Sequence, residues 1–271
     1  MHLEPTGERV IEEFYRSSPE NYLIYLFHVA TYEFARAYVE GRRVLDYGCG
    51  SGYGTHQIAA SCERIIGVDI AGDAVDYACS HYQAPNLSYR RVEPADRAPL
   101  PFDSESFDTV LSFQVIEHIR DTNPYVSEIA RVLKPGGVFV CATPDRSTRL
   151  LRWQKPWNVW HVHEYDADGL ARALAAQFPN PQVLRMGGRS DILNIEIRRT
   201  RRLMWIMLPL TLPFLPESLR IHGLKLLKQF AGQGRRPPAS GTVQFGFDQS
   251  DLTISDDARP SVNLISVARK P

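Results

Sequence analysis

Short apolar runs alternate with longer amphipathic stretches through the middle of the chain. The runs have the length of buried strands, and the stretches between them space their apolar residues as helices do. The expected strands are Arg43–Tyr47, Ile65–Ile70, Leu87–Val92, Thr109–Phe113 and Gly137–Ala142, and the expected helices are Thr55–Ser61, Asp73–His81 and Pro124–Val132. This alternation predicts βαβ units with right-handed crossovers and a mostly parallel sheet.

The flanking segments extend the same pattern. A helix is expected over Asn21–Val39, where Gly41 stops it, and another near Asp168–Gln177. Strands are expected near Gln182–Met186 and at Ser261–Ala268, which alternates apolar and polar residues. The prediction is an α/β fold with a doubly wound, seven-stranded sheet and helices on both faces. It divides into an N-terminal helical cap (1–40), a core (41–188), an insertion or lid (189–260) and a final core strand (261–271).

The insertion carries an unusual surface pattern. Four arginines (Arg198, Arg199, Arg201 and Arg202) precede an apolar stretch, Leu203–Leu215, and a helix is expected near Leu219–Phe230, followed by a Gly/Pro/Ser linker at 232–241. The apolar stretch is shorter than the ~20 residues of a bilayer-spanning helix. Residues 198–230 could rest on a membrane surface, but a hydrophobic lid or a contact in a homodimer is the favoured interpretation.

Composition narrows the range of partners and compartments. The 271 residues suit one domain with additions, and 31 basic residues balance 31 acidic ones. No nucleic-acid partner is expected, because such proteins usually carry a basic excess that neutralises phosphates. No two of the four cysteines are spaced as CxxC, and the first residues lack a signal-peptide pattern. A cytoplasmic location, with possible membrane association, is therefore expected.

The strongest local signal is the stretch Asp46-Tyr47-Gly48-Cys49-Gly50-Ser51-Gly52-Tyr53-Gly54, which follows a strand and opens a helix. Its glycines let the backbone turn sharply and approach a ligand closely. The glycine pattern alone also suits dinucleotides. Asp46, however, would repel a pyrophosphate and suits a cationic amino-acid moiety. Asp69, at the end of the next strand, can accept both hydroxyls of a ribose.

These motifs resemble the class I S-adenosylmethionine (SAM)-dependent methyltransferases, which have a Rossmann-like fold. The resemblance covers about residues 42–188 and continues through Arg91–Asp96 with Leu100–Phe102, then Phe107–Ile119 and Arg131–Gly137. It implies SAM as cofactor, with Asp46 near the methionine moiety, Asp69 on the ribose, and Ala95 or Asp96 at the adenine. The adenine contact stays open because Glu93-Pro94-Ala95-Asp96 stands where the family often has Gly-Asp-Ala. The other expected cofactor contacts are Tyr32, Gly48, Gly50, Tyr53, Ile70, Gln114 and Val115.

Three histidines are candidates for the acceptor side. His118 lies one turn past a strand end and could act as a general base for a hydroxyl acceptor. His161 and His163 belong to Trp157–Tyr165, which resembles a loop over the active site in a branch related to ubiquinone-biosynthesis methyltransferases. Thr6-Gly7-Glu8-Arg9, with the later His28 and Tyr32, resembles the opening of the same branch. No metal is expected, because HxHE alone is no established zinc spacing.

The sequence therefore predicts a SAM-dependent methyltransferase acting on a small-molecule, glycan or glycolipid acceptor, most simply at a hydroxyl. The branch that it resembles often serves the synthesis of surface polysaccharides, glycolipids or secondary metabolites, which is an analogy rather than a property of the site. The alternatives are N- or C-methylation of an amine or quinone-like metabolite, a SAM-binding partner protein without catalysis, and a nicotinamide-dependent oxidoreductase.

Overall fold

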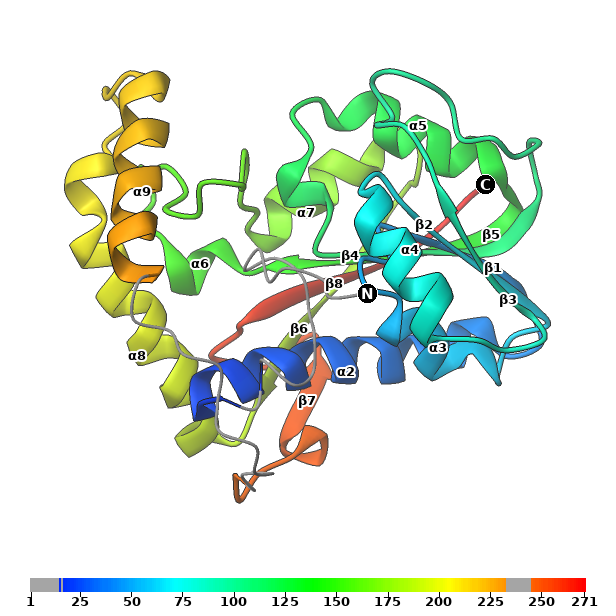
Figure 1. The fold of residues 1–271 in the computed structure, drawn as a ribbon, viewed down its shortest axis with the longest axis horizontal. Coiled ribbons are helices and arrows are strands. Elements are labelled where there is room, and N and C mark those ends of the chain that lie inside the picture. The colour runs from blue at the N-terminus through cyan, green and yellow to red at the C-terminus, as the bar shows by residue number, and fades with distance from the viewer. Residues whose placement is uncertain (1–14, 16, 233–244) are drawn as a thin grey trace.

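A computed structural model describes Tyr15 and residues 17–232 and 245–271 (Figure 1). Its centre is one sheet in the order β3-β2-β1-β4-β5-β8-β6-β7. The strands are β1 (Arg43–Tyr47), β2 (Arg64–Asp69), β3 (Leu87–Arg91), β4 (Phe107–Phe113), β5 (Leu133–Pro144), β6 (Gln182–Gly188), β7 (Leu252–Ser255) and β8 (Asn263–Arg269). From β3 to β5 the neighbours are parallel, whereas β8 is antiparallel to both β5 and β6. The predicted α/β class and mostly parallel sheet are confirmed.

The predicted number of seven strands is wrong, because the described residues form a sheet of eight. The additional strand, β7, pairs antiparallel with β6 from Leu252 opposite Gly188 to Ser255 opposite Arg185. It lies at the edge of the sheet within a polar and acidic segment, and none of its residues is fully buried. Edge strands are commonly short and polar, which keeps them from pairing with other chains. Hydrophobic patterning therefore gave no sign of β7.

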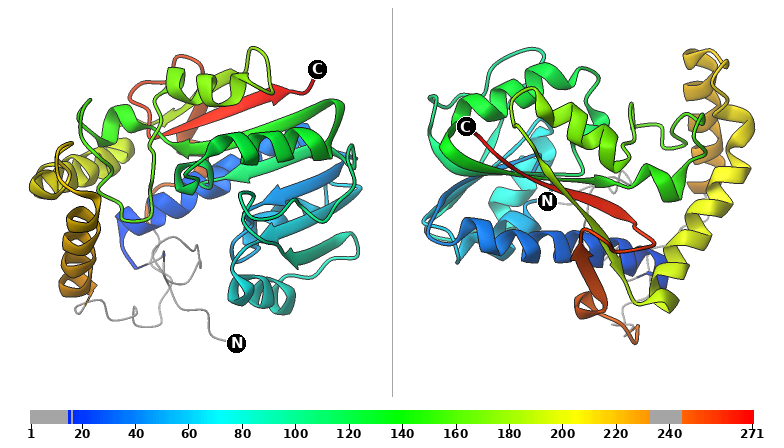
Figure 2. Two further views of the ribbon diagram at one scale, coloured as in Figure 1. Left: turned by 90° about the horizontal axis from the view of Figure 1, so that it is seen from above. Right: turned by 180° about the vertical axis from the view of Figure 1, so that it is seen from behind.

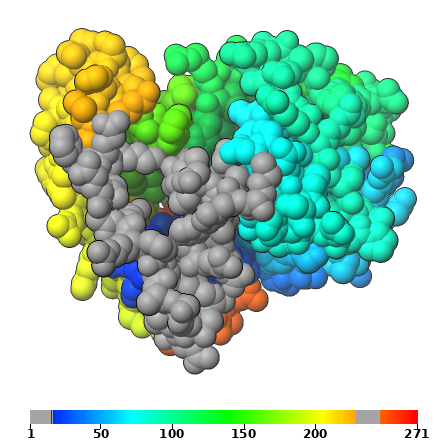
Figure 3. All heavy atoms as spheres, viewed as in Figure 1, coloured from blue at the N-terminus to red at the C-terminus, as the bar shows by residue number. Residues whose placement is uncertain are grey.

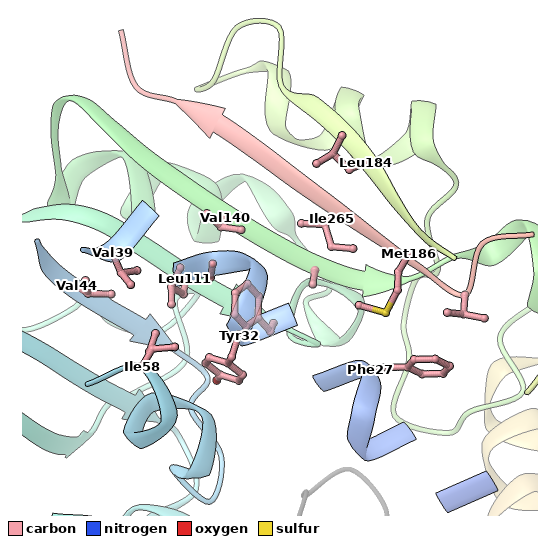
Figure 4. Close-up of a cluster of buried hydrophobic side chains, with 14 of the residues drawn as sticks. Phe27, Tyr32, Val39, Val44, Ile58, Leu111, Val140, Leu184, Met186 and Ile265 are labelled. Atoms are coloured by element: carbon pink, nitrogen blue, oxygen red, sulfur yellow. The ribbon is translucent and has the colours of Figure 1, made fainter. Parts of the chain in front are cut away.

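Helices cover both faces of the sheet, as predicted (Figure 2). They are α2 (Pro19–Val39), α3 (Tyr53–Ala59), α4 (Gly72–His81), α5 (Thr122–Val132), α6 (Arg146–Arg149), α7 (Ala167–Ala175), α8 (Ser190–Ile206) and α9 (Glu217–Gly232), with short 3-10 turns η1 (Ile116–His118), η2 (Leu208–Leu210) and η3 (Gln249–Asp251). One face packs against α2 and α3 (Figure 4) and against the start of α8. The other face packs against α5 and α7. Ser18 and Asp166 cap α2 and α7 by accepting backbone N–H groups.

Central strands read as unbroken apolar runs because both of their faces are buried. Val44 packs into the cluster beneath α2, while its neighbour Leu45 packs into the opposite cluster beneath α5. Leu111 and Val110 on β4 divide in the same way. Successive side chains of a strand point to opposite faces, so a sheet covered on both sides needs apolar residues at both positions.

Helices α8 and α9 form a lobe beside the sheet (Figure 3). The predicted helix at Leu219–Phe230 is present as α9, whereas α8 was not predicted. Helix α8 buries Ile192, Leu193 and Ile197 against the sheet domain, and its arginine-rich second half extends away from it (Figure 1). Of the predicted linker, residues 233–241 lie outside the described part of the chain. Among the described helices, none is long and apolar enough to cross a bilayer.

Candidate active site

A cavity of about 650 Å³ opens at the carboxyl ends of the parallel strands, beside the point where the strand order reverses between β1 and β4. Open α/β sheets bind ligands at this switch point, and the volume is typical of small-molecule sites. The predicted residues that line it are Tyr32, Gly48, Gly50, Tyr53, Asp69, Ile70, Ala95, Asp96, Gln114, Val115 and His118. Another hollow, of about 710 Å³, begins at strand starts such as Arg43 and Arg64 and contains no predicted residue.

The glycine loop is shaped by close packing as well as by backbone conformation. Gly48 has φ +88°, and a Cβ there would lie 2.3 Å from the side chain of Val115. Gly52, at φ +84°, would bring a Cβ within 2.9 Å of both Ala78 and Tyr89. Only glycine fits both the conformation and the space. The loop therefore lies directly against the segment that follows β4.

Asp69 ties the glycine loop to the end of β2. Its Oδ2 accepts the N–H of Gly50 at 2.9 Å, and its Oδ1 accepts the N–H of Ala71 at 2.8 Å. The carboxylate thus stands at the cavity wall with its orientation fixed by the backbone. Ile70 follows it with half of its side chain exposed, and it adds an apolar surface to the same wall.

Asp46 lies behind the cavity wall rather than on it. Its Oδ2 accepts hydrogen bonds from Tyr32 at 2.9 Å and Thr55 at 2.6 Å, while its buried Oδ1 has no partner among the described residues. Burial raises the pKa of this carboxyl group to about 6. Tyr32, which binds Asp46, itself lines the cavity. Its ring lies so close to Gly54 that a Cβ there would clash with it, which shows that helix α2 packs tightly onto the glycine loop.

Both candidates for the adenine contact line the cavity. Ala95 is half-buried and Asp96 is exposed, and they follow β3 on the loop that begins at Val92. The choice between them stays open.

His118 ends the 3-10 turn after β4 and lines the cavity, close to Gln114. Gln114 has φ +57°, an unusual conformation for a residue with a side chain, and its N–H donates to Ala142. The Nδ1 of His118 is 3.0 Å from the carbonyl oxygen of Trp160. Since a carbonyl oxygen only accepts, Nδ1 carries a proton, and proton transfer at this ring would use Nε2.

The structure separates the other two predicted histidines. His161 is buried, its Nδ1 is 2.9 Å from Glu164 Oε1, and its ring lies 5.0 Å from that of His118. His163 is exposed and directs Nε2 at the carbonyl oxygen of Arg120, 3.3 Å away. Neither residue lines the cavity, but the ring of His161 contacts that of His118, which does.

A buried charged network supports the loop that carries His161. Arg149 binds Glu164 at 3.1 Å and stacks over Trp157 at 4.6 Å. Burial alone would raise the pKa of Glu164, but the charge of Arg149 and hydrogen bonds from His161 and Arg149 lower it to about 2. Glu117 is also fully buried and accepts a hydrogen bond from Thr143 at 2.9 Å. Spacing along the chain does not identify these pairs, because Arg149 is 15 residues from Glu164 and Thr143 is 26 residues from Glu117.

His28 also lines the cavity, although it was noted only as part of a resemblance. It precedes Tyr32 by one turn of α2, so the two side chains share a helix face. Burial lowers the pKa of His28 to about 4, which keeps its ring neutral. Helical spacing from Tyr32 could have identified it. Thr6-Gly7-Glu8-Arg9 lies outside the described residues.

Comparison with known proteins agrees with this geometry. Residues 45–141 match the model of a family described as "Methyltransferase domain". A probable S-adenosylmethionine-dependent methyltransferase of Mycolicibacterium smegmatis is 38% identical over 172 residues, which are 64% of this chain and 63% of that protein. One from Mycobacterium tuberculosis is 34% identical over 209 residues, 73% of each chain.

More distant matches cover the same core. A ubiquinone biosynthesis O-methyltransferase of Rhizobium etli is 33% identical over 113 residues, 41% of this chain and 44% of that protein. The structure of an S-adenosylmethionine-dependent methyltransferase from Mesorhizobium loti matches with a TM-score of 0.53 and 16% identity, over 90% of this chain and all of that one. The fold and the cavity thus define a Rossmann-like methyltransferase. The chain belongs to the SAM-dependent methyltransferases, and its cofactor is SAM.

Proposed function

We propose that this enzyme methylates a hydroxyl group of a small molecule, glycan or glycolipid. The observation that carries the proposal is the position of His118 on the cavity wall, where Nδ1 is directed at a carbonyl oxygen and proton transfer would use Nε2. The acceptor oxygen attacks the methyl carbon, the bond from that carbon to the sulfonium sulfur breaks, and S-adenosylhomocysteine leaves. The proton of the hydroxyl passes to Nε2 of His118. The ubiquinone O-methyltransferase relative supports oxygen as the methylated atom.

For the cofactor we propose roles that follow from the observed positions. Asp69 accepts the ribose hydroxyls, and Ala95 or Asp96 meets the adenine. Tyr32 and the charge of Asp46 behind it face the ammonium group of the methionine moiety. Gly48 and Gly50 allow the backbone to approach the cofactor, with Tyr53, Ile70, Gln114 and Val115 as further wall contacts.

Selection of the acceptor belongs, in this proposal, to the segments outside the shared core, at 1–40 and 145–260. The lobe of α8 and α9 exposes Trp205, Ile206 and Phe214. Arg201 and Arg202 are exposed beside them on α8. These residues favour contact with an apolar surface outside the chain, either an anionic membrane that carries a lipid-linked acceptor or a second copy of the chain.

The test measures S-adenosylhomocysteine release with a panel of hydroxyl, amine and quinone-like acceptors. For a hydroxyl acceptor, His118→Gln should lower kcat by about 10²–10⁴-fold, the usual contribution of a general base, and should leave SAM affinity within a few-fold. His81→Gln, an exposed histidine on α4, is the matched control. Full activity of His118→Gln on an amine would favour N-methylation. If His118→Gln turned over every hydroxyl acceptor as fast as the wild type does, the proposal would be overturned.

A further inference from the structure

Three potential metal ligands meet where His118 borders the cavity. One carboxylate oxygen of Glu117 and one ring nitrogen each of His118 and His161 all lie within 4.8 Å of one another. Glu117 and His118 come from the turn after β4, whereas His161 comes from the loop after β5. The fold brings the two segments together, with the backbone N–H groups of Val162 and His163 both directed to the carbonyl of Glu117.

Both histidines are held by their Nδ1 atoms. Nδ1 of His161 lies 2.9 Å from the carboxylate of Glu164, and Nδ1 of His118 lies 3.0 Å from the carbonyl oxygen of Trp160. Both partners only accept, so each Nδ1 donates a proton to its partner, and Nε2 is the ring atom that a metal ion would use. Metal-binding histidines are held in this way, with the second ring nitrogen donating to a carboxylate or a backbone carbonyl.

Glu117 supplies the third ligand. Its side chain is fully buried, and Oε2 accepts a hydrogen bond from Thr143 at 2.9 Å. Its other oxygen, Oε1, is buried and has no hydrogen-bond partner among the described residues. A buried carboxylate oxygen needs a hydrogen bond or a cation to offset its desolvation. The cluster places two histidine rings beside it.

We propose that Glu117 Oε1 and the Nε2 atoms of His118 and His161 bind one divalent transition-metal ion. Two imidazoles and one carboxylate form a ligand set suited to ions such as Zn²⁺, Co²⁺ or Fe²⁺, whereas Mg²⁺ and Ca²⁺ prefer oxygen ligands. Three protein ligands leave coordination positions open, as in catalytic metal sites. The competing explanation is a protonated histidine paired with Glu117, which binds no metal.

A bound ion would change the proton chemistry of the cavity. His118 cannot both bind a metal and accept a proton, because both use the lone pair of Nε2. An acceptor hydroxyl coordinated to the ion would lose its proton to solvent water more readily, since the ion stabilises the oxyanion. This role rests on the hydroxyl acceptor of the proposed function and would take the place of His118 as the base, whereas metal binding itself depends on neither.

The test uses the full chain stripped with a chelator and then titrated with Zn²⁺ in a calorimeter and with Co²⁺ in a visible absorption experiment. The wild type should bind one equivalent of either metal ion. Bound Co²⁺ should give the visible ligand-field bands of a low-coordinate site. Glu117→Gln, His118→Gln and His161→Gln should each weaken binding at least 100-fold. His163→Gln is the matched control, because this histidine is a neighbour in sequence whose ring nitrogen is directed at Arg120. It should bind as the wild type does.

Thr143→Val separates loss of the site from loss of folding. It removes the hydrogen bond to Glu117 but keeps all three ligands, and it should weaken metal binding 10–100-fold while SAM affinity stays unchanged. No binding by the wild type, or equal weakening in His163→Gln, would overturn the proposal. The metal titration contains no methyl acceptor, so its result does not depend on the proposed function. If the protein binds no metal but its methyl transfer depends on His118, only the metal site is rejected. A bound metal without transfer to any hydroxyl would reject only the proposed function.

Discussion

The two sides of the cavity are built in different ways. On the side proposed for the methyl donor (the donor side), Asp46, the glycine loop and Asp69 come from consecutive βα units, and the loop is held by its own backbone and by Asp69. On the side proposed for the acceptor (the acceptor side), His118 and Glu117 after β4 meet Trp160 and His161 from the loop after β5. A donor site encoded in one short stretch can be shared by a whole family. An acceptor site built from tertiary contacts can change without disturbing it.

The largest predicted effect follows from breaking the buried network on the acceptor side. Glu164→Gln removes the nearest charged partner of the buried Arg149 and leaves Glu196, 4.0 Å away, as the next acidic group, so it should cost up to about 3–5 kcal/mol of unfolding free energy. SAM affinity should stay within a few-fold, since no described contact joins this pair to the glycine loop. Urea unfolding and calorimetric SAM titration measure the two quantities. Glu33→Gln, which removes the exposed pair with Arg36, is the control and should cost under about 1 kcal/mol.

The acid dependence of that network has a definite sign. The pKa of Glu164 is lowered from 4.5 to about 2 in the folded protein, so its contribution is present above pH 4.5 and is lost as the pH falls toward 2. Glu164→Gln should flatten this part of the pH–stability curve. A fall in SAM affinity as large as the fall in stability would show that the two sides are not independent.

A smaller effect is expected on the donor side, from Asp46. Its pKa is raised from 3.8 to about 6, so the folded state favours the protonated form. The resulting contribution to stability is present below pH 3.8 and is lost as the pH rises through about 6. If the ammonium group of SAM needs the ionised carboxylate, SAM affinity should fall about tenfold per pH unit below pH 6 and level off above it.

Asp46→Asn is the test of this dependence. It should bind SAM more weakly at pH 7, by about tenfold, and with little change between pH 5 and pH 7. Titration calorimetry at four pH values measures both features. Asp69→Asn is the comparison variant, because it removes a carboxylate from the same cavity but keeps Asp46, so the slope should persist in it. A pH slope that survives in Asp46→Asn would place the titrating group elsewhere.

The same contrast explains what the sequence could predict. Strands β1 and β4 were found because both faces are buried, and the glycine loop was found because its turn requires glycine at Gly48 and Gly52. These signals lie within a few residues. The edge strand β7 was missed because its residues are polar and partly exposed. Helix α8 was missed because the arginines of its second half interrupt the helical spacing of its apolar residues.

The acceptor side shows where local patterns end. The spacing of the histidines in Trp157–Tyr165 predicted no metal site, because such a spacing covers only ligands within that stretch. In the fold, His161 meets Glu117 and His118 while His163 is directed at Arg120, so adjacent histidines have different surroundings. Burial of Glu117 is decided by Thr143 and by the loop after β5. Only the arrangement of these segments in space reveals the cluster.

The smallest predicted effect concerns the lobe, which lies outside both sides of the cavity. If its exposed surface contacts anionic membranes, the double substitution Trp205→Ser with Phe214→Ser should lower co-sedimentation with phosphatidylserine-containing vesicles about three- to tenfold. Each exposed arginine near such a surface contributes about 1 kcal/mol, so the wild type should pellet less with neutral vesicles or at high salt. SAM affinity should not change, because neither residue lines the cavity. Unchanged pelleting, together with conversion of a dimer to a monomer in sedimentation velocity, would assign the surface to a second copy of the chain.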